Sequence, residues 1–239
     1  FTDKNILITG STKGLGRALA TKFAEKGATV IGHFYTNGKE AEEFLQELRK
    51  FNLRCGTFQA NLRSPEQTAE MMEKIHQEYG HIDILINNVG NFIYKPFDQV
   101  TFEEFADVIE TNLYSSFLCS KLVIEKMKER KSGHIINIGC AGADRIIIRE
   151  LTTPYYIAKT GVLMLTKILA NAYAPYGIRV NAISPGILET SIAKPKVPAG
   201  RYANFDDIFN AMSFLLSPES SYVNGANIEV AGAWSPGVK

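Results

Sequence analysis

A tyrosine and a lysine four residues apart, Tyr155 and Lys159, form a pair with clear chemical potential. In an α-helix, residues at this spacing share one face, so the phenol and the ammonium would lie close together. A free phenol has a pKa of about 10 and exchanges protons poorly at neutral pH, whereas a neighbouring ammonium favours the phenolate and lowers that pKa. The pair is therefore a candidate proton donor and acceptor, although ordinary helix surfaces also carry such pairs.

A glycine-rich segment near the start of the chain is a second candidate site. It reads Thr9-Gly10-Ser11-Thr12-Lys13-Gly14-Leu15-Gly16-Arg17. It follows an apolar run that predicts a strand, and it opens a helical pattern. Glycines let the backbone turn sharply and approach a pyrophosphate closely, and the free N–H groups at the helix start favour an anion. We interpret the segment as a dinucleotide-binding loop; a plain turn that needs glycine is the alternative.

The elements that would position these residues alternate between short apolar runs and longer helical patterns. Strands are expected at residues 6–9, 28–33, 55–59, 82–86, 134–138, 178–183 and 227–230, and helices at 16–26, 38–51, from Ser64 onward, 101–130 and 154–173. Short, almost wholly apolar strands are typical of a parallel sheet covered on both faces. The alternation predicts an α/β fold: a Rossmann-type, doubly wound parallel sheet of about seven strands with helices on both faces, in a single domain over residues 1–239. A closed eight-fold barrel is the structural alternative.

The composition narrows the class of function. The chain has 239 residues, of which 45% are hydrophobic and 21% charged, as in ordinary globular proteins. Its net charge of +1 lacks the basic surplus of nucleic-acid-binding proteins. Its first residues lack the features of a signal peptide, and no apolar run is long enough for a membrane span, so we expect a cytoplasmic protein without a membrane partner. The three cysteines are too few and too far apart to predict disulfides or a metal site.

Several motifs together resemble the classical short-chain dehydrogenase/reductase family, over essentially the whole chain. The glycine loop is similar to that family's Thr-Gly-x-x-x-Gly-x-Gly, and Asn87-Asn88-Val89-Gly90 is similar to its Asn-Asn-Ala-Gly. Residues 155–159 give its Tyr-x-x-x-Lys, Asn112 lies in the long helix, and residues 181–190 resemble its Pro-Gly-x-x-x-Thr segment. The resemblance implies a nicotinamide-dependent oxidoreductase that reduces a carbonyl to an alcohol, or catalyses the reverse reaction.

The resemblance implies catalytic roles for Tyr155, Lys159, Asn112 and Cys140. Tyr155 would be the general acid/base, Lys159 would hold the nicotinamide ribose and tune Tyr155, and Asn112 would support a water that relays protons. Cys140 stands where the family has a Ser that polarises the substrate carbonyl, and a thiol is a weaker donor than a hydroxyl. We expect a working enzyme. A catalytically weak or inactive NADP-binding protein is the alternative, and enoyl reduction is a further one.

The expected cofactor is NADP, with NAD less favoured. Enzymes that prefer NAD usually place an acid about 20 residues beyond the loop. No acid occurs here near Phe34, and Lys13 stands where NADP-preferring relatives carry a basic residue. Asn61 replaces the Asp that usually caps the adenine. The residues expected to contact the cofactor are Gly10, Ser11, Thr12, Lys13, Gly14, Leu15, Gly16, Phe34, Asn61, Leu62, Asn88, Val89, Gly90, Tyr155, Lys159, Pro185, Gly186, Ile187 and Thr190.

The expected substrate is a small carbonyl compound. By resemblance its contacts come from residues 91–94, 145–151 and 187–190, which are mainly apolar. Arg145, Arg149 and Glu150 are candidate anchors for a charged group, unless they are solvated or lie at a subunit interface. Residues 186–190 and 197–201 look most like the 3-oxoacyl-[acyl-carrier-protein] reductase branch, so 3-oxoacyl thioesters are one candidate.

Two C-terminal segments depart from the family pattern. Residues 190–201 form a short lid where one or two helices normally intervene in the family. Either the pocket is open to solvent, or part of a longer, flexible lid is missing from this sequence. Residues 227–233 replace the usual Asp-Gly-Gly. In relatives, this last region and the helix of Tyr155 form tetramer contacts, so we expect a homotetramer, with a homodimer as the alternative.

Overall fold

The computed structural model describes residues 1–145 and 147–236, which contain a seven-stranded sheet of order β3-β2-β1-β4-β5-β6-β7. The strands are β1 (Asn5–Ile8), β2 (Thr29–Phe34), β3 (Gly56–Gln59), β4 (Ile84–Asn87), β5 (Gly133–Ile138), β6 (Ile178–Pro185) and β7 (Asn227–Val230). The pairs β1–β2, β1–β4, β2–β3 and β6–β7 run parallel. This open order confirms the doubly wound sheet and excludes the closed barrel. The order reverses at β1, and such reversals are where α/β sheets bind ligands.

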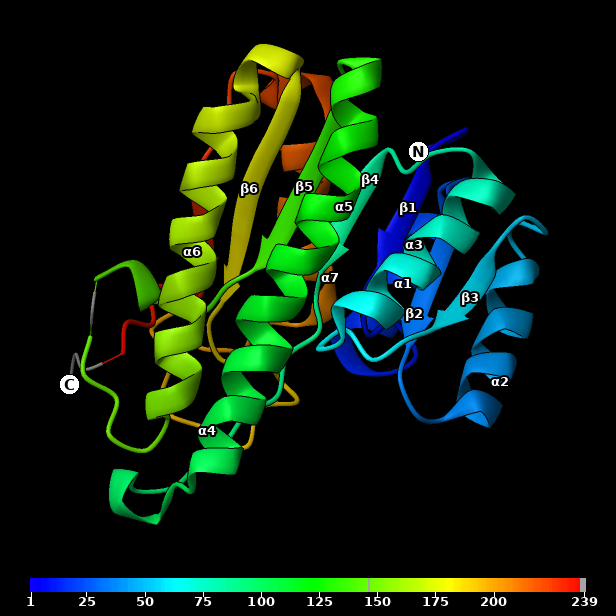
Figure 1. The fold of residues 1–239 in the computed structure, drawn as a ribbon. Helices are drawn as coiled ribbons and strands as arrows, with labels where there is room; N and C mark the ends of the chain where they lie inside the picture. Colours follow the sequence, from blue (N-terminus) through cyan, green and yellow to red (C-terminus); the bar gives the residue numbers. More distant parts are fainter. Residues whose placement is uncertain (146, 237–239) are drawn as a thin grey trace. The chain divides into compact units, whose positions relative to one another are not determined.

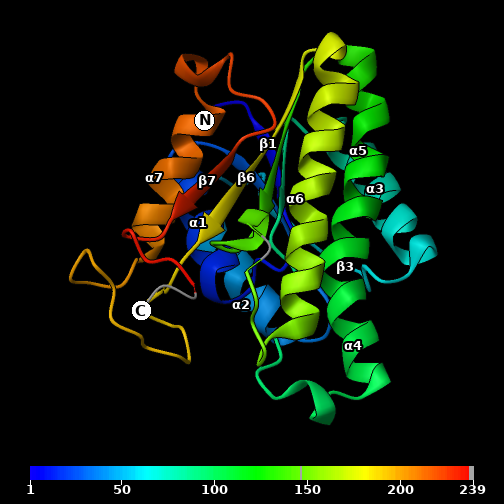
Figure 2. The same ribbon diagram turned by 90° about the vertical axis from the view of Figure 1, so that its left-hand side faces the viewer.

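The chain groups into two compact units. The first unit comprises residues 1–89, 114–136 and 173–179, and the second comprises the described residues of 90–113, 137–172 and 180–239. In the first unit, α1 (Gly14–Glu25) and α2 (Gly38–Arg49) cover one face of the strands, and α3 (Pro65–Tyr79) and α5 (Ser115–Arg130) cover the other (Figure 1). In the second unit, α6 (Thr153–Tyr173) and α7 (Phe205–Leu216) lie on opposite sides of β6 and β7 (Figure 2).

Buried apolar side chains hold the first unit together. Ile6, Leu7 and Ile8 of β1 are completely buried, as are Phe23 of α1 and Phe44 of α2. Each such side chain contributes roughly 1.5–3 kcal/mol when it is removed from water. After Asn5, the strand β1 is wholly apolar because helices cover both of its faces.

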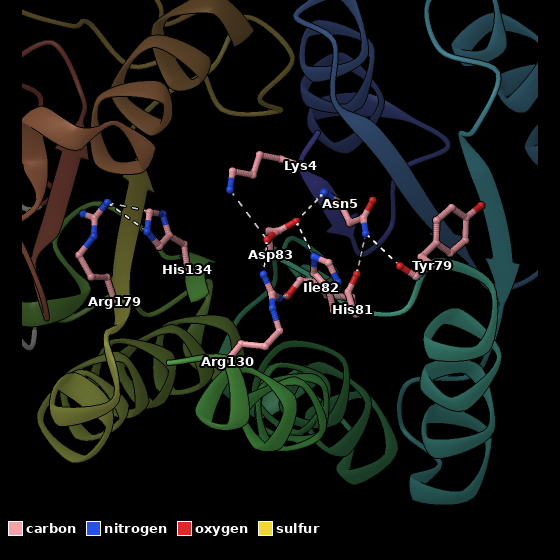
Figure 3. A network of polar contacts seen from close by, with 9 residues as sticks. All are labelled: Lys4, Asn5, Tyr79, His81, Ile82, Asp83, Arg130, His134 and Arg179. Atoms are coloured by element: carbon pink, nitrogen blue, oxygen red, sulfur yellow. Dashed lines mark hydrogen bonds and ion pairs between the residues drawn. The ribbon is translucent and has the colours of Figure 1, made fainter. Parts of the chain in front are cut away.

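A polar network fixes the amino ends of the strands in the first unit (Figure 3). The nearly buried carboxylate of Asp83, just before β4, accepts from the backbone N–H of Asn5 at 2.9 Å and from the guanidinium of Arg130 at 2.7 Å. Burial alone would raise the pKa of Asp83, but these hydrogen bonds hold it below its usual value. In the same network, the guanidinium of Arg179 lies within 3.5 Å of the ring nitrogens of His134.

The expectation of one continuous helix over residues 101–130 is wrong in one respect, because a π-helical turn interrupts the helix. The turn, Glu110–Tyr114, separates α4 (Phe102–Ile109) from α5. The Asn112 side chain donates to the backbone oxygen of Val108 at 2.9 Å, four residues earlier. A side chain that takes up this carbonyl competes with the regular i to i−4 ladder, which explains the wider turn.

The helix α7 is an element that the sequence patterns above did not predict. Asn204 and Asp207 form a capping box at its start, and Ile208, Met212 and Leu215 bury its apolar side. Residues 186–204, between β6 and α7, contain no helix, as the short lid implies.

Candidate active site

The glycine loop of the first unit forms a tight turn after β1. Gly10 has a positive φ of 62°, and a Cβ on Gly16 would overlap the Gly10 carbonyl oxygen. The Asn88 side chain donates to the backbone oxygens of Thr9 and Gly10 at 3.0 and 3.1 Å. In return, Thr9 Oγ1 accepts from the backbone N–H groups of Asn88 and Val89. Asn88 and Val89, both expected to contact the cofactor, therefore support the turn itself.

The start of α1 fits a pyrophosphate group. Lys13 is the N-cap residue, its side chain does not cap the helix, and no acidic residue lies in the first turn. Lys13 and Gly14 are exposed, whereas Ser11, Thr12 and Gly16 are buried. The first N–H groups of a helix lack intrahelical partners, and together with the helix dipole they favour an anion. With the crowded contact between Gly10 and Gly16, this start offers the close backbone approach that a dinucleotide requires.

Three further predicted cofactor residues lie at the end of β2 and just after β3. Phe34 is the half-buried last residue of β2, and Leu62 is buried beyond β3. The side-chain oxygen of Asn61 accepts from the backbone N–H and the Nε of Arg63 at 3.1 and 3.3 Å. The neighbouring His33, which the sequence patterns did not single out, bonds to the glycine loop through its ring.

In the second unit, α6 brings Tyr155 and Lys159 together on one face. The buried Lys159 ammonium lies 5.5 Å from the centre of the Tyr155 ring and donates to the Ile138 carbonyl oxygen at 2.6 Å. The ring of Phe92 meets Tyr155 edge-on, with centroids 4.9 Å apart. Phe92 belongs to the segment expected to contact the substrate, so this segment and α6 meet at Tyr155.

The acidity of this pair differs from the expectation. Burial lowers the pKa of Lys159 to about 8, whereas burial raises the pKa of Tyr155 well above its usual value of 10. The expected lowering at Tyr155 is absent because burial disfavours the charged phenolate, and the Lys159 ammonium donates to the Ile138 carbonyl oxygen. Tyr155 consequently keeps its proton at neutral pH, which is the form that a general acid requires.

Cys140 lies near Tyr155. Cys140 and Tyr155 pack against one buried cluster that includes Tyr156 and Leu163. The thiol makes a long contact of 3.7 Å with the Ala141 carbonyl oxygen, to which the Tyr156 hydroxyl donates at 2.7 Å. Burial raises the pKa of Cys140, so the side chain is a neutral thiol and a weak hydrogen-bond donor.

Asn112 ties the segment after β4 to the π-helical turn. It is fully buried and donates to the Asn91 carbonyl oxygen at 2.9 Å. A Cβ on Gly90 would overlap the Asn112 side-chain oxygen, which explains a glycine at this position. At the end of β6, Gly186 donates to the Val230 carbonyl oxygen at 3.0 Å. The other predicted residues there are the half-buried Pro185, the buried Ile187 and the exposed Thr190.

A carboxylate from β7 supports the loop after Cys140, a contact that the sequence patterns did not reveal. Glu229 accepts from the Gly142 backbone N–H at 2.7 Å and from Arg145 at 3.1 Å. Arg149 is half-buried, and its guanidinium lies 5.3 Å from the Tyr156 ring centre and 5.5 Å from that of Trp234. Ile146, within the expected substrate segment, lies outside the described residues.

An open, mainly apolar cavity of about 670 Å³ lies in the second unit and is lined by residues from 96–98 and 147–157. Its walls include Phe97, Ile148, Leu151, Tyr156 and Ile157.

Within residues 1–145 and 147–236, no cluster of three or more His, Cys, Asp or Glu side chains is arranged to hold a metal ion. Over the same residues, none of the helices has the length and apolar character needed to cross a membrane.

The strand order and the glycine loop define a Rossmann-type α/β protein. Residues 4–200 match the family model described as short chain dehydrogenase. The 3-oxoacyl-[acyl-carrier-protein] reductase FabG of Escherichia coli (strain K12) is 35% identical over 249 residues, and the match covers 97% of each chain. The 2-dehydro-3-deoxy-D-gluconate 5-dehydrogenase of Formosa agariphila is 33% identical over 243 residues, covering 96% of this chain and 91% of that protein.

A solved structure supports the same relationship. A short chain dehydrogenase from Bacillus anthracis superposes with a TM-score of 0.88 at 32% identity, covering 96% of this chain and 95% of that chain. The protein therefore belongs to the short-chain dehydrogenase/reductase family of oxidoreductases and lies near its 3-oxoacyl-[acyl-carrier-protein] reductases.

Proposed function

We propose that the protein is an NADP(H)-dependent oxidoreductase that reduces a carbonyl to an alcohol, or catalyses the reverse, with Tyr155 as general acid/base. The observation that carries the proposal is the contact between Tyr155 and Lys159, four residues apart on one face of α6. The whole chain would act as one cofactor-binding domain. The nicotinamide cofactor, when bound, supplies the hydride.

The protein's own residues handle the proton and the substrate oxygen. Tyr155 gives its phenolic proton to the carbonyl oxygen as negative charge develops there, and it takes a proton back in the reverse direction. The Lys159 ammonium stabilises the phenolate that remains and holds the cofactor ribose. Asn112 orders the segment beside it and supports the water through which Lys159 receives a new proton. Cys140 is a weak donor to the substrate oxygen, in the place of a hydroxyl.

NADP is the proposed cofactor because a lysine lies at the amino end of α1 and no acidic residue lies at the end of β2. Lys13 is exposed at the N-cap of α1, and the residues from Phe34 to Gly38 include no carboxylate that would repel a 2′-phosphate. Replacing Lys13 by Ala should weaken NADPH binding about tenfold, as for loss of one charge-assisted hydrogen bond, and leave NADH binding unchanged. Lys50→Ala, an exposed lysine at the end of α2, is the matched control.

The substrate is proposed to be a small carbonyl compound, with 3-oxoacyl thioesters as the leading candidates. Their support is the name of the Escherichia coli relative and the mainly apolar cavity beside α6. The polar head of such a substrate would lie at Tyr155, and its apolar chain would suit a wall that contains Ile148 and Leu151. Keto-gluconates are the main alternative class of substrate, because the Formosa agariphila relative is named as a 2-dehydro-3-deoxy-D-gluconate 5-dehydrogenase.

We also propose a homotetramer, with a homodimer as the alternative. On α6, Ile157, Met164 and Ile168 are about half exposed, and their spacing of seven and four residues places them along one side of the helix. A stripe of this kind suits contact with another copy of the chain. Light scattering coupled to size exclusion should give a mass of four chains, and Ile168→Glu should lower it; a monomeric wild type would contradict the proposal.

The experiment that tests the proposed function is a cofactor titration followed by an assay of NADPH oxidation. Purified protein should bind NADPH more tightly than NADH and should oxidise it with at least one member of a panel of ketones, 3-oxoacyl thioesters and keto-gluconates. Binding without turnover on the whole panel would favour the noncatalytic alternative. If the Cys140 thiol limits the reaction, Cys140→Ser should raise kcat; a strong donor elsewhere would leave kcat unchanged.

A further inference from the structure

The ring of His33 joins two segments of the first unit that are far apart in sequence. His33 is the fifth residue of β2, and only 2% of it is exposed. Its Nδ1 atom lies 3.1 Å from the backbone nitrogen of Gly10, in the glycine loop. Its Nε2 atom lies 3.0 Å from the backbone oxygen of Ala60, just after β3. Both ring nitrogens are therefore used, one on each segment.

The two partners determine which nitrogen of His33 carries the proton. A carbonyl oxygen can only accept, so Nε2 must donate to Ala60, and an N–H group can only donate, so Nδ1 must accept from Gly10. This assignment requires a neutral ring. Burial lowers the pKa of His33 to about 4, so the ring is neutral at physiological pH.

The backbone of His33 holds the same loop. Its carbonyl oxygen accepts from the backbone N–H of Ser11 at 3.0 Å and lies 3.4 Å from the Ser11 hydroxyl. On the other side of the turn, the Gly10 carbonyl oxygen accepts from Asn88. The peptide groups of Gly10 and Ser11 are thus fixed by the protein itself, and the N–H groups at the start of α1 remain for an anion.

We propose that His33 is a positioning residue for the dinucleotide. Its ring holds the Gly10 turn at a set distance from Ala60, and so aligns the loop that takes the pyrophosphate with Asn61, which would take the adenine. The ring itself does not have to touch the cofactor. This inference rests on the proposed function, because it concerns the same cofactor.

Three substitutions separate the two ring contacts. His33→Asn keeps an acceptor near the position of Nδ1 and so preserves the bond from Gly10. His33→Gln keeps a donor near the position of Nε2 and preserves the bond to Ala60. His33→Phe keeps an aromatic ring but neither bond. His134→Phe is the control, because it removes another imidazole of the first unit, the half-buried one at the amino end of β5 (Figure 3).

The test measures the Kd for NADPH by fluorescence titration, kcat and KM on the best carbonyl substrate, and stability in urea. His33→Phe should raise the Kd and KM for NADPH about tenfold, as expected for loss of a buried hydrogen bond that orients the loop. Its kcat at saturating NADPH should change far less. His33→Asn should recover most of the affinity, and His134→Phe should bind NADPH like the wild type even though it is destabilised.

Two results would overturn the inference while leaving the proposed function intact: His33→Phe binding NADPH as tightly as the wild type, or His33→Asn binding no better than His33→Gln. If His33→Phe fails to fold, the comparison of His33→Asn with His33→Gln still tests the role of His33. A wild type that binds neither NADPH nor NADH would overturn both proposals together.

Discussion

Lowering the pH from 7.5 to about 5 is expected to destabilise the protein through His134 (Figure 3). Burial first, and then the charges of Arg179 and Lys4, lower the pKa of His134 from 6.5 to about 4, against a smaller opposing effect of Asp83. Below pH 6.5 the unfolded chain binds a proton on this residue that the folded protein does not. The stability that depends on the neutral ring is therefore complete above pH 6.5 and is lost as the pH falls towards 4.

The size of the effect follows from the two pKa values. At pH 5, a group with a pKa of 6.5 in the unfolded chain and about 4 in the folded protein destabilises the fold by about 2 kcal/mol. The pKa of His33 is also lowered to about 4, and it should add a similar amount, so the wild type should lose about 4 kcal/mol through the two residues. Most carboxylates of the unfolded chain titrate below this pH and contribute little.

The variant His134→Phe isolates the contribution of His134. Phenylalanine keeps an aromatic face against Arg179 but cannot bind a proton. Between pH 7.5 and 5, the variant should lose about 2 kcal/mol less stability than the wild type, measured by urea unfolding followed by circular dichroism. The protein concentration must be held fixed, because assembly links stability to concentration. Equal losses of stability in both proteins would refute the argument that a half-buried, neutral His134 resists protonation.

Three further predictions concern Asp83, Glu229 and Lys159. Asp83→Asn should destabilise the protein by about 3 kcal/mol in urea unfolding, because it leaves the Arg130 charge without its nearly buried partner; a change below about 1 kcal/mol would argue against this network. Glu229→Ala should lower kcat several-fold at unchanged NADPH affinity, because it releases the loop after Cys140. Glu229→Gln retains an acceptor for the Gly142 N–H and should lose less activity. Equal kcat values in the two variants would contradict the role of that acceptor. The pH profile of kcat/KM for reduction should fall above about pH 8, where Lys159 loses its charge, and a profile flat to pH 10 would contradict this.

Local sequence patterns predicted most of the strands because those residues are buried on both sides. The apolar run of β1 and the glycines that follow it are visible in the sequence, since close packing admits few other side chains there. The spacing of Tyr155 and Lys159 also placed them on one helical face, as the structure has them. These features depend on neighbouring residues alone.

Features that depend on distant residues could not be predicted in this way. His33 bonds to residues 23 and 27 positions away, and Glu229 bonds to a residue 87 positions away, so neither contact has a local pattern. The acidity of Tyr155 was wrongly expected to follow from Lys159 alone, because burial outweighs the nearby charge. The helix α7 did have a local signal, the capping pair Asn204 and Asp207, which the sequence interpretation did not use.

The reaction itself is tested most directly by Tyr155→Phe, with Tyr173→Phe at the end of the same helix as the matched loss of a hydroxyl. If Tyr155 is the proton donor, its replacement should lower kcat by about 10²–10⁴ while the Kd for NADPH changes little. Tyr173→Phe should keep both values near those of the wild type. A Tyr155→Phe variant that turns over substrate at the wild-type rate would contradict the account at its centre.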